Sequence, residues 1–438
     1  MMDIQDLYQL FLTHPSVCTD TRKITPDCIF FALKGDTYNA NEFALQALGG
    51  GAAYAVIDDP NYKADDRCLV VENVLDTLQK LATHHRRQLK IPFIGITGSN
   101  GKTTSKELIN SVLSQRYKTY ATKGNLNNHI GVPLTLLSIS ADIEIAIVEM
   151  GANHQKEIEC LCSISQPTHG LITNVGKAHL EGFGGFEGVK IGKGELYQDL
   201  ARSGGVVFLN RDNNHLVGMS RKANVQNTVC YGRGADCYVN GQLESSDPFL
   251  TVSWKRELIE MDASPQLAKS NLTGTYNLEN VLAAICLGSF FELTPEEINT
   301  GIAAYQPANN RSQISKTEKN TLICDFYNAN PSSMAVALDN LNSVRGETKA
   351  IILGDMFELG DESAAEHKAV FEKAMSVDAG RRIFIGKEFH KLSGVEKAEF
   401  YSSTQDALEA LKKNPLKDYT ILVKGSRSMK LETLAEFL

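Results

Sequence analysis

The segment GSNGKTT, residues 98–104, combines the residue types best suited to binding a phosphate chain. It follows the apolar run PFIGIT and precedes a stretch whose apolar residues have helical spacing. In a glycine loop at the start of a helix, backbone N–H groups can bind phosphate oxygens. Lys102 adds a positive charge for the terminal phosphates, and the Thr103 hydroxyl can ligate Mg²⁺. The segment therefore predicts a nucleoside triphosphate site.

The spacing of the glycines in this loop distinguishes between classes of nucleotide-binding protein. The common phosphate-loop pattern would require a glycine at position 96, where this chain has Ile96. A shorter pattern, G-x-x-G-K-T-T, fits the segment better than the pattern of general phosphate-loop enzymes. The alternative is a chance glycine turn before a helix, but that would not explain the lysine and the paired threonines.

Three further side chains have types that suit a site beside this loop. Glu149, in IVEMGAN, ends a predicted buried strand, where a carboxylate can bind a hard cation. His179, in TNVGKAHLEGF, is expected to end the next strand and to act as a metal ligand or a base. A desolvated Lys193, in KIGKGELY, could capture CO₂ as a carbamate. The ordinary alternatives are a solvated carboxylate, a structural histidine and a solvated helix lysine.

The elements that must position these residues fall into three segments. Residues 1 to about 88 contain short apolar runs (CIFFAL, AYAVID and CLVVE) and end in the helix-like stretch VLDTLQKLATHHRRQL. From Ile91, strands alternate with helices, which predicts a mainly parallel sheet covered on both faces. Residues 228–262 are expected to form an antiparallel appendage. The NLEN helix follows, and then a capping box at Thr294–Glu297.

The last segment, residues 321–438, repeats the alternation of strands and helices. It predicts a second doubly wound α/β domain of about four strands, separated from the preceding block by the polar stretch PANNRSQISKTEKN. The chain is thus expected to be an α/β protein with three domains, at residues 1–88, 89–311 and 312–438.

Composition excludes several classes of protein. The chain has 438 residues, with 42% hydrophobic and 22% charged residues, which indicates a globular protein of more than one domain. Lys+Arg 44 against Asp+Glu 52 gives 44 − 52 = −8, so we expect no general attraction for nucleic acid or an anionic membrane. The nine cysteines lack the repeated spacing of a zinc or disulfide framework, and we expect reduced thiols in a cytoplasmic protein. We expect neither a signal peptide nor a membrane span.

The motifs together resemble the Mur ligase family, and most closely its MurF type. The resemblance runs through the whole chain and rests on ten segments: TDTRK, GITGSNGKTTSKE, NLNNHIGVPLTLL, VEMGANHQKEI, ITNVGKAHLEGFG, KGELY, NLEN, DFYNANPSSM, LGDMFELG and KGSRSMKLE. It implies an N-terminal UDP-binding domain, a central phosphate-loop ATPase domain and a C-terminal Rossmann-like domain. The implied reaction is ATP-dependent joining of D-alanyl-D-alanine to UDP-N-acetylmuramoyl-tripeptide through an acyl phosphate, in a monomer.

The resemblance also implies roles for individual residues. Lys102, His179 and Lys193 would be catalytic. The expected ATP-binding residues are Gly98, Asn100, Gly101, Lys102, Thr103, Thr104, Asn277, Asn280, Arg311, Asp325 and Asn330. The expected ligands of two Mg²⁺ ions are Thr103 and Glu149 for the first, and His179 and carbamylated Lys193 for the second. The expected substrate-binding residues are Thr21, Arg22, Lys34 and Gly35 for the uridine diphosphate, and Asn125, Asn127 and Asn128 for the muramoyl group.

Two positions depart from the family pattern, and several alternatives stay open. Tyr276 stands where many relatives carry histidine, and Phe326 stands where a small residue is common, so the packing of the nucleotide is in doubt.

Within the class, the alternatives are a sister ligase that adds another residue or a folylpolyglutamate synthase. From other classes, they are a phosphate-loop kinase or motor ATPase and a non-catalytic binding protein.

Overall fold

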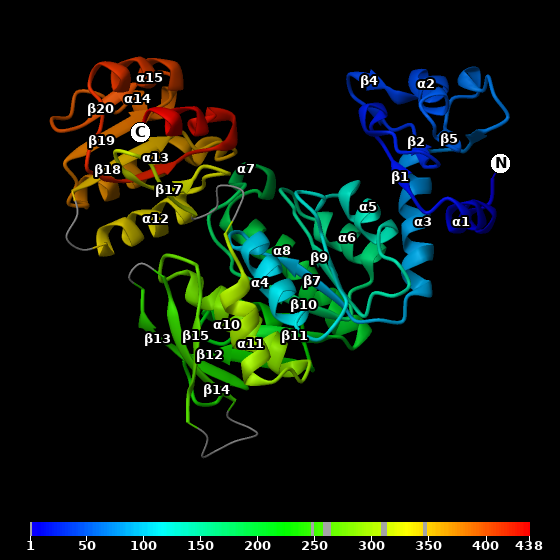
Figure 1. Ribbon diagram of the computed structural model, residues 1–438, viewed down its shortest axis with the longest axis horizontal. Helices are drawn as coiled ribbons and strands as arrows, with labels where there is room; N and C mark the ends of the chain where they lie inside the picture. Colours follow the sequence, from blue (N-terminus) through cyan, green and yellow to red (C-terminus); the bar gives the residue numbers. More distant parts are fainter. Residues whose placement is uncertain (1, 247–248, 257–263, 308–312, 345–347) are drawn as a thin grey trace.

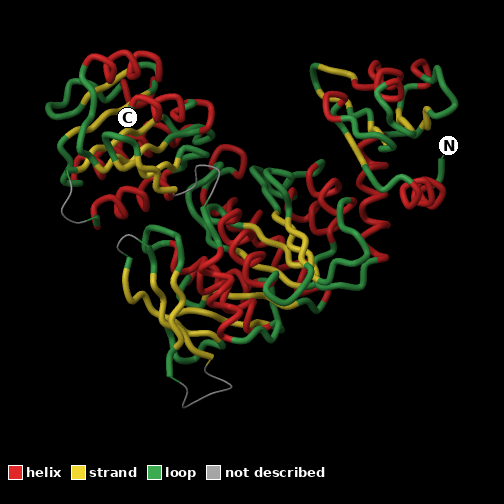
Figure 2. Tube along the Cα trace, viewed as in Figure 1, coloured by secondary structure: helices red, strands yellow, loops and turns green. Residues whose placement is uncertain are grey.

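The computed structural model describes residues 2–246, 249–256, 264–307, 313–344 and 348–438 of the chain. Within these ranges the chain forms three α/β units, each built on its own main sheet. Figure 1 shows the N-terminal unit (blue) and the C-terminal unit (yellow through orange to red) on opposite sides of the central one. The strands of each unit lie among its helices, as Figure 2 shows.

The N-terminal unit is a small parallel sheet with the order β1-β2-β5-β6. The three apolar runs predicted as strands correspond to β2, β5 and β6. The elements in chain order are α1 Ile4–Thr13, β1 Val17–Cys18, η1 Thr21–Lys23, β2 Ile29–Phe31, β3 Lys34–Gly35, β4 Tyr38–Asn39, η2 Ala40–Phe43, α2 Ala44–Gly49, β5 Tyr54–Ile57, η3 Pro60–Tyr62 and β6 Cys68–Val70.

Helix α3 (Val74–Gln88) joins this unit to the central one, as the sequence predicted. Its last turn carries Arg86, a buried guanidinium that donates to three main-chain carbonyls, those of Ser165 (2.8 Å), Leu89 (3.0 Å) and Gln166 (2.7 Å). The same guanidinium lies 3.7 Å from the ring centroid of Phe93. Burial lowers the pKa of Arg86 to about 10. Arg86 therefore connects the end of α3 to the C-terminal end of α6.

The central unit is built on a large sheet that is parallel through most of its width. The described strands have the order β15-β14-β13-β12-β11-β10-β7-β9-β8. They are β7 Phe93–Thr97, β8 Thr119–Ala121, β9 Ile145–Glu149, β10 His169–Ile172, β11 Val206–Asn210, β12 Thr228–Gly232, β13 Val239–Ser245, β14 Thr251–Arg256 and β15 Gln266–Lys269.

Helices cover both faces of this sheet, as the alternation predicted. Apolar side chains of α4, α10 and α11 form one buried cluster, and those of α5, α6 and α8 form another that continues into α3. The helices are α4 Lys102–Leu113, α5 Gly131–Leu137, α6 Glu157–Ser165, α7 Leu180–Phe183, α8 Phe186–Ser203, α9 Asn214–Lys222, α10 Asn277–Phe290 and α11 Pro295–Ala304. The predicted capping box at Thr294 and Glu297 is confirmed.

The predicted antiparallel appendage at residues 228–262 is wrong in part. Strand β12 pairs in parallel with β11, and β13 pairs in parallel with β12, so both strands extend the central sheet. The antiparallel pairing within the segment is that of β13 with β14, and β14 pairs antiparallel in turn with β15, which follows the segment. The turn-rich sequence concealed the parallel pairing because short strands give a weak periodic signal. Residues 257–262 lie outside the described residues.

The C-terminal unit has more strands than the sequence indicated. Its described sheet has six, in the order β16-β17-β21-β18-β19-β20, and all its pairs are parallel except β16 with β17. The unpredicted strands are the edge strands, β16 Gln313–Lys316 and β20 Glu399–Tyr401. The remaining elements are β17 Thr321–Asp325, α12 Pro331–Ser343, β18 Lys349–Gly354, η4 Gly360–Glu362, α13 Ser363–Ser376, β19 Arg381–Ile385, α14 Lys387–His390, α15 Thr404–Lys413, β21 Thr420–Lys424, η5 Arg427–Met429 and η6 Leu431–Phe437.

Two further expectations concern the chain as a whole. All nine cysteines are free thiols, as the irregular spacing predicted. Among the helices of the described ranges, none combines the length and apolar character needed to cross a membrane.

Replacing Arg86 with alanine should destabilise the junction between α3 and the central unit. Three carbonyl acceptors would lose their donor and a buried cation–π contact would disappear, which we expect to cost about 2 kcal/mol or more. The measurement is the urea midpoint of the first unfolding transition. The matched control is Arg87→Ala, which removes an exposed arginine from the same turn. Equal midpoints for the two variants would contradict a structural role for Arg86.

Candidate active site

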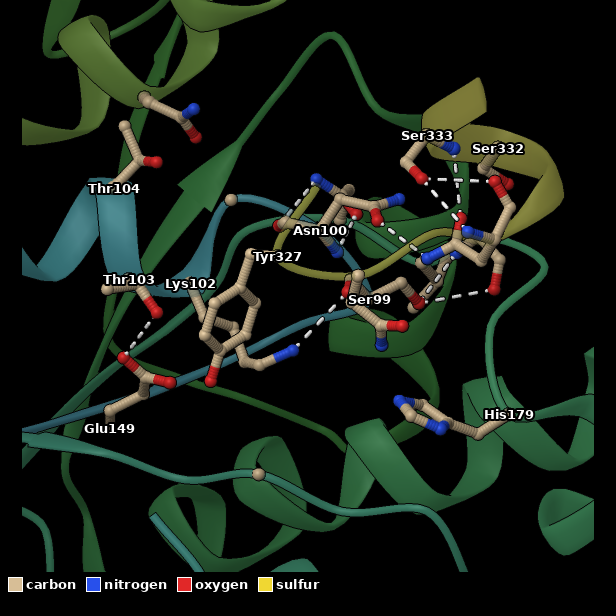
Figure 3. A pocket seen from close by; sticks show the side chains of 18 of the residues that line it. Ser99, Asn100, Lys102, Thr103, Thr104, Glu149, His179, Tyr327, Ser332 and Ser333 are labelled. Carbon is tan, nitrogen blue, oxygen red and sulfur yellow. Dashed lines mark hydrogen bonds between the residues drawn. The ribbon is translucent and has the colours of Figure 1, made fainter. Parts of the chain in front are cut away.

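A cavity of about 770 Å³ lies between the glycine loop of the central unit and the start of helix α12 in the C-terminal unit. Figure 3 shows the side chains of Lys102, Thr103, Glu149 and His179 around this space, with the Tyr327 ring drawn over the Lys102 side chain. The residues that the sequence predicted for ATP and that line the cavity are Asn100, Gly101, Lys102, Thr103, Thr104, Asn277, Asn280, Asp325 and Asn330. The structure therefore brings together side chains from two units of the chain.

The glycine loop connects β7 directly to α4, as predicted. Gly98 has φ +146° and Gly101, the residue before the helix, has φ +76°, and both values disfavour an L side chain. A β-carbon at Gly98 would also collide with the hydroxyl of Thr173. Both glycines are thus required by the backbone, which leaves the first N–H groups of α4 directed toward the cavity.

Lys102 folds back over this loop. Its ammonium donates to the carbonyl oxygens of Gly98 (2.6 Å) and Ser99 (3.3 Å). A cation held on the loop carbonyls lies beside the helix N-terminus, where an anion is favoured. The positive charge is therefore placed where a phosphate chain would lie.

A hydroxyl and a carboxylate meet at the start of α4. The register pairs Ile96 of β7 with Glu149 of β9, which brings the end of β9 beside the loop. The Thr103 hydroxyl donates to Glu149 Oε2 at 2.9 Å, and the Asn127 amide donates to Glu149 Oε1 at 2.8 Å. Glu149 is only 2% exposed. These oxygens are hard donors of the kind that Mg²⁺ prefers, so the donor set fits the first predicted cation.

His179 lies in the cavity wall, but not where the sequence placed it. The prediction that it ends a strand is wrong, because β10 ends at Ile172 and His179 precedes the short helix α7 with φ +53°. The intervening loop instead bonds to the glycine loop, for example from the Thr173 hydroxyl to the Asn100 carbonyl at 2.6 Å. The His179 ring uses Nδ1 to contact the carboxylate of Glu358 in the C-terminal unit.

Lys193 is buried in α8, which contradicts the alternative of a solvated helix lysine. Its side chain is 1% exposed, and its ammonium donates to the Ala152 carbonyl at 2.9 Å and lies 4.9 Å from the ring centroid of Phe183. Burial, followed by the neighbouring Lys102 cation, lowers the pKa of Lys193 well below its usual range. No carboxylate forms an ion pair with Lys193 among the described residues. A neutral amine at this place fits the chemistry of carbamate formation.

The two asparagines predicted for adenine lie at the start of α10, and both are buried. The Asn280 amide donates to Asn277 Oδ1 at 2.8 Å, and Asn277 donates to the Thr273 carbonyl at 2.7 Å. Asn280 also accepts from the Ser105 hydroxyl at 3.0 Å, which connects α10 to α4. The pair therefore forms a fixed polar edge of the cavity.

The C-terminal unit contributes polar groups to the opposite wall. The Asn330 amide, at the start of α12, donates to Asn100 Oδ1 of the glycine loop at 2.8 Å. Asp325 pairs with Lys424 at 2.5 Å, and Lys424 is only 2% exposed. Lys424 was not predicted, although it begins the KGSRSMKLE segment. Arg311, predicted for the same wall, lies outside the described residues.

The residues predicted for uridine diphosphate lie apart from this cavity, on the N-terminal unit. Lys34 pairs with Asp58 at 2.8 Å, and Arg22 pairs with Asp20 at 2.9 Å. Thr21 lies beside Arg22 in η1, and Gly35 lies beside Lys34 in β3. Of the three asparagines predicted for the muramoyl group, Asn127 and Asn128 line the cavity, whereas Asn125 is not among its lining residues.

Comparison with known proteins gives matches along the whole chain. The family model described as the Mur ligase middle domain matches residues 96–288, and the one described as Mur ligase, glutamate ligase domain, matches residues 310–427. A relative in Escherichia coli (strain K12), named UDP-N-acetylmuramoyl-tripeptide–D-alanyl-D-alanine ligase, is 34% identical over 98% of this chain and 94% of its own. A relative of the same name in Bacillus subtilis (strain 168) is 32% identical over 98% of this chain and 94% of its own.

The solved structures agree with these relatives. A crystal structure of MurF from Acinetobacter baumannii has a TM-score of 0.86 and 28% identity, and the match covers 98% of this chain and 97% of that one. A MurF ligase from Thermotoga maritima in complex with ADP has the same fold, with a TM-score of 0.85 at 23% identity over 100% of this chain and 98% of that one. The family that the sequence motifs indicated is confirmed, and the chain belongs to the Mur ligase family.

Proposed function

We propose that this chain joins D-alanyl-D-alanine to UDP-N-acetylmuramoyl-tripeptide, giving UDP-N-acetylmuramoyl-pentapeptide, ADP and phosphate. The observation that carries the proposal is the convergence of Lys102, Thr103, Glu149 and His179 on one cavity. The full-length relatives that bear this name support the choice of substrates. The product belongs to peptidoglycan synthesis and therefore to cell-wall formation.

The chemistry explains why the cavity needs this set of residues. A carboxylate does not react with an amine at neutral pH until one of its oxygens becomes a good leaving group. Transfer of the γ-phosphoryl group of ATP to that oxygen gives an acyl phosphate and ADP. The amine of D-alanyl-D-alanine then attacks the acyl carbon, phosphate leaves with the oxygen, and the amine loses a proton. Lys102 contributes to the first step by offsetting the negative charge of the phosphate chain.

Two Mg²⁺ ions would supply the charge neutralisation that lets the anionic carboxylate approach the anionic nucleotide. Thr103 and Glu149 would hold one ion, because their oxygens already lie 2.9 Å apart. His179 and Lys193 would hold the other. For that role the neutral Lys193 amine adds to CO₂ and releases a proton, and the resulting carbamate offers oxygens in place of an ammonium. The buried position of Lys193, whose ammonium contacts a carbonyl and an aromatic ring and forms no ion pair among the described residues, supports this assignment.

We assign the remaining predicted residues to two binding regions. For ATP, Gly98, Asn100, Gly101 and Thr104 complete the glycine loop, Asn277 and Asn280 would face the adenine, and Arg311, Asp325 and Asn330 would close the site from the C-terminal domain. For the sugar-peptide, Thr21, Arg22, Lys34 and Gly35 would bind the uridine diphosphate, and Asn125, Asn127 and Asn128 would lie along the muramoyl group. The domain limits at residues 88 and 311 belong to the same proposal.

The working unit belongs to the same proposal, and we propose a monomer. The free thiols support a cytoplasmic location, because reducing compartments preserve them. ATP hydrolysis without ligation would instead indicate a motor or other ATPase, and phosphorylation of a hydroxyl would indicate a kinase. The group that accepts distinguishes the three activities: it is water for an ATPase, a hydroxyl for a kinase and an amine for the ligase.

Phosphate release should depend strictly on the amine. With ATP, magnesium and UDP-N-acetylmuramoyl-tripeptide present, adding D-alanyl-D-alanine should start turnover, because the acyl phosphate persists until an amine attacks it. Oxygen-18 in the terminal carboxylate of the tripeptide should appear in the released phosphate, as mass spectrometry can measure. Label that stays in the peptide, or phosphate release without the dipeptide, would contradict the proposed reaction.

Lys102→Ala should abolish activity, with a fall in kcat of about 100-fold or more because the phosphate chain loses its fixed cation. The measurement is steady-state phosphate release at saturating substrates. Lys118→Ala is the matched control, since it removes an exposed lysine that is not among the residues lining the cavity. Retention of full activity by Lys102→Ala would exclude the glycine loop from catalysis.

Lys193→Ala should be deeply impaired yet partly restored by a short carboxylic acid such as acetate. The small acid would enter the space left by the side chain and supply the oxygens of the missing carbamate. The measurement is the rate of ligation across a series of acid concentrations. Lys190→Ala, one turn earlier in α8, should neither lose the activity nor respond to the acid. A Lys193→Ala enzyme that no acid restores would count against the carbamate.

A further inference from the structure

The LGDMFELG segment, residues 353–360, has no role in the proposed reaction so far. It runs from the end of β18 to η4, at the edge of the C-terminal unit that faces α7 of the central unit. Contacts between α7 and η4 connect the two units at this edge. The segment is therefore placed to act across the domain boundary.

The first half of the segment anchors it within the C-terminal unit. The Asp355 carboxylate accepts from the main-chain N–H groups of Glu388 (2.9 Å) and Phe389 (3.0 Å). The N–H of Met356 donates to His367 Nε2 at 3.0 Å. These buried bonds fix the direction in which the chain leaves β18.

The second half reaches the central unit and holds the His179 loop. The Glu358 carboxylate contacts His179 Nδ1, and the Glu358 carbonyl accepts from the N–H of Glu181 at 3.3 Å. Both His179 (φ +53°) and Glu358 (φ +62°) are in the left-handed region, so each side chain is aimed by an uncommon backbone conformation. The segment at Glu358 in the C-terminal unit therefore contacts the segment at His179 in the central unit through both side-chain and main-chain atoms.

Apolar packing supports the same contact. Met356 (1% exposed) and Leu359 (3% exposed) belong to one buried cluster with Leu180 and Phe183 of α7. Phe183 is also the ring that lies over the Lys193 ammonium. The docking of the C-terminal segment therefore reaches both residues proposed for the second cation, His179 by a polar contact and Lys193 through Phe183.

We infer that Glu358 is a positioning residue that orients His179 for the second cation, so that this cation site is complete only when the C-terminal unit is docked. The inference rests on the proposed function. With Nδ1–H donating to Glu358, the lone pair of Nε2 is left for the metal, which is the usual arrangement of a carboxylate, a histidine and a metal ion. Asp355, in the first half of the segment, only stabilises the C-terminal unit through its hydrogen bonds to main-chain N–H groups.

The test is a count of bound Mn²⁺ by electron paramagnetic resonance. The full-length enzyme is loaded with a non-hydrolysable ATP analogue and UDP-N-acetylmuramoyl-tripeptide, and Mn²⁺ is titrated. Glu358→Ala should weaken the second Mn²⁺ about tenfold or more and leave the first unchanged, as the loss of an outer partner of a metal ligand does. In turnover, kcat at low Mg²⁺ should fall and recover at high Mg²⁺, while KM for the UDP substrate is kept.

Two further variants make the result decisive. Asp361→Ala removes an exposed carboxylate from η4 and should behave as the unmodified enzyme. His179→Ala should lose the second Mn²⁺ altogether. If His179→Ala loses it but Glu358→Ala binds both ions normally, the positioning inference fails and the proposed metal ligands stand. If His179→Ala itself keeps both ions, the metal assignment fails, and the inference fails with it.

Glu358→Ala keeps the β-carbon at this left-handed position, and the Glu358 side chain is 54% exposed, so we expect the variant to fold. Glu358→Gln retains an oxygen that can accept from Nδ1–H and should keep most of the Mn²⁺ affinity. A Glu358→Gln enzyme as weak as Glu358→Ala would contradict the hydrogen-bonding role.

Discussion

The site depends on one electrostatic constraint, which is that a phosphate chain and a carboxylate, both anionic, must approach each other away from water. Several groups that line the cavity can offset this negative charge. The first turn of α4 presents N–H groups, Lys102 lies on the loop beside them, and Thr103 and Glu149 provide oxygens for a cation. These groups act strongly only if bulk solvent is excluded, because screening weakens them in water. The wall contributed by the C-terminal unit is therefore part of the chemistry.

The strand order of the central sheet brings the residues of the site together. Strands β9 and β10 lie on either side of β7, so the segments that follow all three strands meet at one edge. Such an edge is where doubly wound sheets bind ligands. The residues proposed to bind the uridine diphosphate lie on the N-terminal unit and do not line the cavity. One end of the sugar-peptide substrate would thus be held while the other is activated.

The sequence predicted the elements that neighbouring residues define. It did not predict the strands that depend on pairing with distant parts of the chain. The unit of β7, the glycine loop and α4 was predicted because an apolar run, two glycines and a helical stripe lie next to one another. Strands β16 and β20 were missed because edge strands carry polar or half-exposed residues and show little alternation. The predicted position of His179 was wrong because the loop after β10 bonds to the glycine loop, 73 residues earlier, and no local pattern reveals this contact.

Two buried lysines show what the sequence cannot decide. Lys106 and Lys193 both lie within helices, and their side chains are 0% and 1% exposed. Lys106 donates to the Thr122 carbonyl at 2.5 Å and pairs with the Glu107 carboxylate at 2.8 Å, so its charge is compensated. Lys193 instead meets the Ala152 carbonyl and the Phe183 ring, while Lys102 adds a second positive charge nearby. Burial and the Lys102 cation lower the pKa of Lys193, and they outweigh the opposing effect of the Glu157 and Glu195 carboxylates. The two lysines therefore differ in the charge environment that the fold places around each of them.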